Sequence, residues 1–139
     1  MEVTYLHLQA GQTLPHIPFA RPFKAVVVIE DDVTPAWRSV ASEWLARAGC
    51  LYMMAWGRDC SLWDDSVNVA NLEAFKFQEI PDDAFIMTTW HEDETLEEVF
   101  DYALRSAFHP TVEIDRIVIV DIAPVERRTE MLALFERAG

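Results

Sequence analysis

Apolar and polar positions alternate in blocks along the chain, and each apolar block predicts one strand or helix. Four runs are rich in β-branched or other large apolar residues, and each ends abruptly at polar residues. This is the pattern of strands buried on both faces of a sheet. The predicted strands are residues 25–29, 50–56, 84–90 and 117–120, with a shorter β-prone run at residues 3–6.

Between these strands, apolar residues recur three and four positions apart, which is the spacing of one buried helix face. The first helix is predicted between Thr34, its N-cap, and Gly49, which ends it. The others are a weaker helix at about residues 62–75, one that follows Thr95, and one that opens at Pro124. The positions expected to be buried are Trp37, Val40, Ala41, Trp44, Leu45 and Ala48 in the first helix, Leu96, Val99, Phe100, Ala103, Leu104 and Ala107 in the third, and Leu132 and Phe135 in the last.

The alternation of strands and helices predicts a three-layer α/β/α sandwich around a mostly parallel sheet of four to five strands. This is a Rossmann-like or flavodoxin-like arrangement. The N-terminal strand is expected at an edge, where an antiparallel direction is an option. Residues 1–22 are predicted to be this strand and a proline-rich arm containing Pro15, Pro18 and Pro22, and residues 23–139 a single α/β domain.

Polar residues follow every predicted strand, at the edge of the sheet where open parallel domains bind ligands. Asp31 and Asp32 follow the first long strand, and Asp121 ends the last one. Carboxylate oxygens are the ligands that Mg²⁺ prefers. The sequence therefore predicts these three residues as a candidate magnesium site, and Mg²⁺ as the candidate cofactor.

Two short segments also resemble response-regulator receiver domains. Residues 26–32 resemble their first strand, where an acidic pair binds magnesium, and residues 116–121 resemble the strand that carries their phospho-acceptor aspartate. Asp121 comes ninety positions after Asp31, which is too far along the chain for a receiver domain. The resemblance is therefore limited to these two segments.

A second group supplies a candidate nucleophile and base. Cys60 precedes a predicted helix, and a helix N-terminus lowers the pKa of a thiol. The acidic neighbours Asp59, Asp64 and Asp65 oppose that activation, so a buried and unreactive cysteine is the competing interpretation. The candidate catalytic residues are Asp59, Cys60 and His91.

Tryptophans beside carboxylates make the same edge of the sheet a candidate binding surface. An indole is costly to leave half-exposed, so a tryptophan at a rim more often lines a ligand or partner site. The competing interpretation is that the acids only stabilise helix N-termini. The candidate rim contains Trp56, Arg58, Trp63, Trp90, Glu92, Asp93, Glu97, Glu98 and Asp101.

The charge of the chain restricts its partners. Its 139 residues include 24 acidic and 11 basic side chains, for a formal net charge of −13. Such a charge argues against nucleic acids and anionic membrane surfaces as binding partners. The excess is local, because residues 66–115 have a net charge of −10 and residues 79–101 contain nine acids and no lysine or arginine. We expect this segment to attract basic partners.

Several other classes of site are missing from the sequence. Neither of the glycine-rich phosphate-binding motifs GxGxxG and GxxxxGK[ST] occurs, and the cysteines and histidines have no zinc-finger spacing. The sequence has no secretory signal pattern and no apolar run of about 20 residues, so we expect a cytoplasmic location without membrane contact. Cys50 and Cys60 are then expected to be reduced.

Two motifs resemble a family of uncharacterised bacterial proteins. They are A-W-G-R-D-C-S-L-W-D-D-S-V at residues 55–67 and T-T-W-H-E-D-E at residues 88–94. The resemblance implies a small stand-alone domain of bacterial origin and supplies no reaction. Because of the tryptophan and carboxylate rim and the negative charge, the sequence favours a module that binds a basic protein, as in an immunity or regulatory role. A small Mg²⁺-dependent phosphate-transfer or hydrolytic enzyme and a small-ligand sensor remain the alternatives.

Overall fold

The computed structural model describes residues 1–17 and 22–139, so Pro18 of the predicted arm lies outside the described residues. Its central feature is one five-stranded sheet, in which every pairing is parallel and the order is β1-β5-β2-β3-β4. The strands are β1 (Glu2–Leu8), β2 (Phe23–Ile29), β3 (Cys50–Gly57), β4 (Met87–Trp90) and β5 (Arg116–Ile122). The helices are α1 (Pro35–Ala48), α2 (Cys60–Ala74), α3 (Leu96–Arg105) and α4 (Arg128–Ala138), with a short 3₁₀ helix η1 (Asp82–Ala84).

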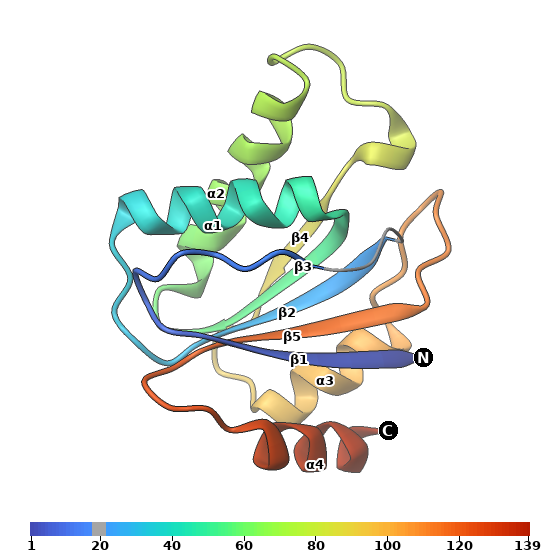
Figure 1. Cartoon of the computed structure of the whole chain (residues 1–139). Helices are drawn as coiled ribbons and strands as arrows, with labels where there is room; N and C mark the ends of the chain where they lie inside the picture. The colour runs from blue at the N-terminus through green and yellow to red at the C-terminus, as the bar shows by residue number, and fades with distance from the viewer. Residues whose placement is uncertain (18–21) are drawn as a thin grey trace.

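The helices form two layers, one on each face of the sheet. Figure 1 shows α1 and α2 over one face and α3 and α4 over the other. Alternate strand residues point to opposite faces, so Val27 packs in the α1–α2 core while Val26 and Val28 pack in the α3–α4 core. All seven residues of β2 and of β5 are buried. The predicted α/β sandwich is therefore confirmed.

The N-terminal strand lies at an edge as expected, but the antiparallel option is wrong. β1 runs parallel to β5, in register from the pair Glu2–Arg116 to the pair Leu8–Ile122. Between two parallel strands the chain has to cross back to the end of the sheet at which the first strand began. Residues 9–17 begin this return, and the indoles of Trp37 and Trp44 hold them by donating hydrogen bonds to the carbonyls of Gln12 and Pro15 at 2.9 and 2.7 Å.

The first helix begins and ends as predicted, but its buried face is narrower. The Trp37 N–H donates to the N-cap hydroxyl of Thr34, and Gly49 adopts a left-handed conformation at the C-terminus. Val40 was expected to be buried and is 50% exposed. The reason is that α2 packs against the opposite side of the helix, where the Ser42 hydroxyl lies 2.8 Å from that of Ser66.

Two predicted boundaries are wrong. The strand expected from residue 84 begins at Met87, because η1 ends only at Ala84 and the next residue, Phe85, is exposed. The last helix begins at Arg128 instead of Pro124. Residues 123–127 serve as a connection that brings Arg127 back to the end of β5.

Gly57 ends β3 in a conformation that suits only glycine. Its φ is +110°, and an added Cβ would lie 2.2 Å from the carbonyl oxygen of Ile29. We expect Gly57→Ala to lower the free energy of unfolding by about 3 kcal/mol, because backbone strain adds to a main-chain clash. Gly11→Ala is the control, since Gly11 has φ +86° and an added Cβ would meet no atom of the described residues within 4 Å, and should cost about 1 kcal/mol. Urea unfolding followed by circular dichroism measures both, and equal losses would contradict the clash.

Candidate functional site

The carboxyl ends of β2 and β5 form the topological switch point of the sheet. These two strands are neighbours, but the chain leaves β2 toward α1 on one face and leaves β5 toward α4 on the other. In open parallel sheets a ligand crevice usually opens at such a point. Glu30, Asp31 and Asp32 follow β2 here, and Asp121 lies near the end of β5.

A buried ion pair occupies this switch point. The Asp121 side chain is fully buried and accepts hydrogen bonds from Arg127 Nη2 at 2.5 Å and from the Tyr5 hydroxyl at 2.6 Å. The Arg127 backbone N–H donates to the Tyr5 oxygen at 2.9 Å, and Arg127 Nη1 lies 3.4 Å from Glu30 Oε1. Burial and the bond to Asp121 raise the pKa of Tyr5 to about 12. The four side chains thus form a connected polar network that ties β1, β2, β5 and the start of α4 together.

The other predicted metal ligands lie in different contacts. Asp32 is exposed and pairs with Arg58, whose Nη1 is 2.9 Å from Asp32 Oδ1. Asp31 accepts a hydrogen bond from the Asp32 N–H, and among the described residues neither aspartate shares a partner with Asp121. Within residues 1–17 and 22–139, no three histidine, cysteine, aspartate or glutamate side chains gather in a way that could hold a metal ion. Magnesium binding remains a prediction.

His91 is buried at the end of β4 with both ring nitrogens engaged. Nδ1 lies 2.6 Å from Glu94 Oε2, and Nε2 lies 2.8 Å from Thr89 Oγ1. The Tyr102 ring packs edge-on at a centroid distance of 4.9 Å, and its hydroxyl is 2.6 Å from that of Tyr52. A hydroxyl, an imidazole and a carboxylate in contact in this order resemble the catalytic triad of hydrolases. His91, however, is only 6% exposed.

Cys60 is the first residue of α2 and is buried beside the main chain of His91. Burial raises the pKa of the thiol, the His91 N–H lowers it by a smaller amount, and the carboxylate of Glu92 raises it further. Asp59 is exposed, adopts a left-handed conformation with φ 51°, and makes no side-chain cap bond. The three candidate catalytic residues are therefore neighbours. The Cys60 thiol faces the main chain of His91, however, and the His91 ring contacts Thr89 and Glu94 instead.

Both thiols are expected to be unreactive in the folded protein. Burial raises the pKa of Cys50 to about 12 and raises that of Cys60, and only the thiolate attacks disulfides. At pH 8 we expect Cys50 to react with 5,5′-dithiobis(2-nitrobenzoate) about a thousandfold more slowly than in guanidinium, where both thiols become accessible. Absorbance at the thionitrobenzoate band measures this. Rapid reaction of Cys60 in the native protein would restore its candidacy as a nucleophile.

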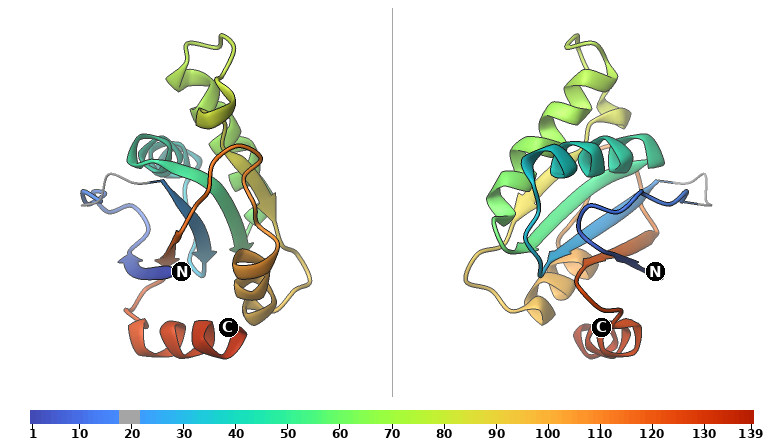
Figure 2. Two further views of the ribbon diagram at one scale, coloured as in Figure 1. Left: turned by 90° about the vertical axis from the view of Figure 1, so that its right-hand side faces the viewer. Right: turned by 60° about the vertical axis from the view of Figure 1, so that its left-hand side comes forward.

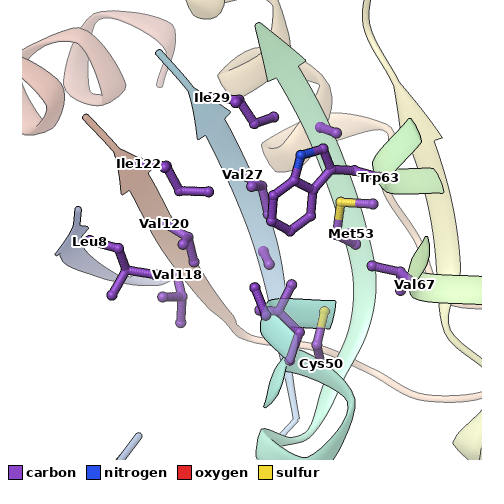
Figure 3. Packing of buried hydrophobic residues seen from close by; sticks show 14 of the residues in the cluster. Leu8, Val27, Ile29, Cys50, Met53, Trp63, Val67, Val118, Val120 and Ile122 are labelled. Carbon is purple, nitrogen blue, oxygen red and sulfur yellow. The ribbon is translucent and has the colours of Figure 1, made fainter. Parts of the chain in front are cut away.

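The three tryptophans of the predicted rim have different environments. Trp56 is half-buried and donates from its indole to the Glu94 carbonyl at 2.7 Å. Trp90 is 47% exposed. Trp63 was wrongly placed at the rim, because it is 1% exposed, and Figure 3 shows its indole over β2 and β3 beside Val27 and Met53.

Exposed carboxylates precede and follow β4, and we call them the acidic surface. Figure 2 (left) shows η1, β4, the following connection and α3 along one side of the molecule. Glu97 and Glu98 lie on the exposed face of α3, as predicted, while Asp101 pairs with Arg105. The acidic surface consists of Glu79, Asp82, Asp83, Glu92, Asp93, Glu97, Glu98 and Asp101.

Sequence reasoning did not identify Tyr5 and Arg127 as partners of Asp121. Tyr5 is 116 positions away from Asp121 in the chain, and no spacing rule connects two such residues. The one local signal was a strand that ended in an aspartate followed within six residues by an arginine. Such a pair is too common in loops to predict a buried contact.

A family model described as "Domain of unknown function (DUF7684)" matches residues 3–138. Neither a curated protein nor a solved structure gives a significant match to the chain. The expected resemblance to a family without an assigned reaction is confirmed by the first finding, while the two motifs and a bacterial origin stay predictions. In the part of the chain that the structure describes, no helix has the length and apolarity needed to cross a membrane.

Proposed function

This chain belongs to a family described only as a domain of unknown function, and from its surface we propose that it binds a basic protein partner. The proposed contact comprises the acidic surface and the exposed indole of Trp90. An immunity or regulatory role, in which the domain covers a basic region of another protein, is compatible with such a contact.

The observation that carries this proposal is the charge of residues 79–101. They contain nine acids without a lysine or arginine, and all except Glu94 are exposed. Two of the nine form ion pairs, Glu94 with His91 and Asp101 with Arg105, and the remaining seven have none within the described residues. Unpaired charges of one sign create a field that attracts the opposite charge and that salt screens.

Binding to a basic peptide tests the proposal. The probe is an acetylated and amidated nine-residue peptide of alternating arginine and valine, with the glutamate–valine peptide as its control. We expect the arginine peptide to bind, with an affinity that falls at least about tenfold between about 50 and about 300 mM NaCl. Isothermal titration calorimetry measures the affinity, and the glutamate peptide should not bind.

A matched pair of variants locates the contact. Glu97→Lys with Glu98→Lys reverses two charges of the acidic surface, and we expect at least about fivefold weaker binding. Asp65→Lys with Glu73→Lys makes the same change of net charge on exposed positions of α2 and should weaken binding less than about twofold. Equal weakening by both pairs, or binding that is insensitive to salt, would overturn the proposal.

A further inference from the structure

The side of β4 that faces away from β3 presents main-chain groups that have no partner among the described residues. β4 is the last strand of the sheet and pairs only with β3 in the described structure. The His91 N–H, directly after β4, donates to the Ala55 carbonyl of β3 at 2.9 Å. Because main-chain groups alternate between the two sides of a strand, the N–H and C=O groups of Thr88 and Trp90 point away from β3. They form a short open edge that another strand can join.

An aromatic anchor lies beside this open edge. The Thr88 side chain points to α2, where its hydroxyl bonds to the carboxylate of Asp64 and to Asn68. Trp90 is two residues further along the strand and lies on the same face of the sheet. Its indole is 47% exposed, so an added strand could cover it. Burial of a half-exposed indole is a common anchor of a binding interface.

Negative charge lies at both ends of β4. Asp82 and Asp83 precede the strand and Glu92 and Asp93 follow it, all four exposed. An extended segment with basic residues along it would pair its main chain with β4 and place its cations near these carboxylates.

We propose that the open edge of β4 binds an extended, basic segment of the partner protein as a sixth strand of the sheet. This proposal rests on the proposed function and specifies the conformation in which the partner binds. The main chain of Thr88 and Trp90 supplies hydrogen bonds, the Trp90 indole packs on the added strand, and the acidic surface selects a basic sequence.

The distribution of charge favours β4 over β1 as the binding edge, and a basic segment over a second copy of the chain as its occupant. Two copies of the chain joined through β4 would bring two acidic surfaces together, which like-charge repulsion opposes. The other edge of the sheet, β1, carries one acid, Glu2, and its carboxylate is 2.8 Å from the guanidinium of Arg116. A basic segment therefore meets complementary charge at β4 and not at β1.

N-methylation of the arginine–valine peptide tests main-chain pairing at constant charge. A strand pairs through one of its two edges, so methyl groups on alternate residues leave one edge free, whereas methyl groups on consecutive residues block both. We expect the alternately methylated peptide to bind within about threefold of the unmodified one, and the consecutively methylated peptide at least about tenfold more weakly.

Hydrogen exchange locates the added strand on the protein. Binding of the unmodified peptide should slow exchange of the Thr88 and Trp90 amides, while the Met87 and Thr89 amides are already protected by β3. Trp90→Ala should weaken peptide binding at least about fivefold, and Val40→Ala, an exposed apolar control on α1, should not.

The outcomes separate the two proposals. If the peptide binds and depends on salt, but tolerates blocking of both edges and leaves the Thr88 and Trp90 amides unprotected, strand addition is wrong and the basic partner stands. If no basic peptide binds at low salt, the proposed function is wrong and strand addition falls with it.

Discussion

Replacing Trp63 by alanine is expected to lower the free energy of unfolding by about 3–5 kcal/mol. The indole is 1% exposed and packs between α2 and the sheet, beside Val27 and Met53. Alanine would leave a cavity that the strands below cannot fill, because their main chain is fixed by the β-ladder. Urea unfolding followed by circular dichroism at 222 nm measures the loss.

Trp90→Ala is the matched control for this substitution. It removes the same side chain from a position that is 47% exposed, so the free energy of unfolding should change by less than about 1 kcal/mol. The two variants should behave in opposite ways toward the basic peptide, since Trp90→Ala weakens binding and the folded fraction of Trp63→Ala retains it. A small stability change for Trp63→Ala would mean that this indole does not belong to the core.

Asp121→Asn is expected to cost about 3 kcal/mol of unfolding free energy. Asparagine has nearly the same shape but no charge, so the Arg127 guanidinium, 20% exposed, would lose its buried counter-ion. The Tyr5 hydroxyl would also lose the carboxylate to which it donates at 2.6 Å. Chemical denaturation at pH 7 measures the difference from the unmodified protein.

Asp32→Asn is the control for this loss. Asp32 also pairs with an arginine, but the side chains of Arg58 and Asp32 are 61% and 90% exposed. Solvent screens such a pair, and we expect a change of less than about 0.5 kcal/mol. Similar values for the two aspartates would show that the Asp121 pair does not stabilise the fold.

The elements predicted correctly were those specified by local pattern. The cap at Thr34, the stop at Gly49 and the apolar spacing of α3 depend on residues within four positions of each other. The same spacing correctly predicted that Glu97 and Glu98 are exposed, because these residues lie off the buried face.

The errors arose where distant segments decide the environment. Trp63 lies in the chain among polar residues that suggested a rim, but α2 turns it into the core. Val40 fits the apolar spacing of α1, but α2 packs on the other side of that helix. The direction of β1 depends on β5, more than a hundred positions later. The polar network around Asp121 could not be predicted for the same reason.

The order of the strands has a consequence for how the protein is synthesised. β1 is the first strand to leave the ribosome, and its neighbour β5 is the last. The hydrogen bond from the Arg127 N–H to the Tyr5 hydroxyl joins residues 122 positions apart. β2, β3 and β4 can assemble during translation, whereas β1 must wait without a partner until residues 116–122 have been made. The sheet is therefore completed only after β5 has been made, and a nascent chain that stops before β5 leaves β1 without its neighbour and exposed to chaperones and proteases.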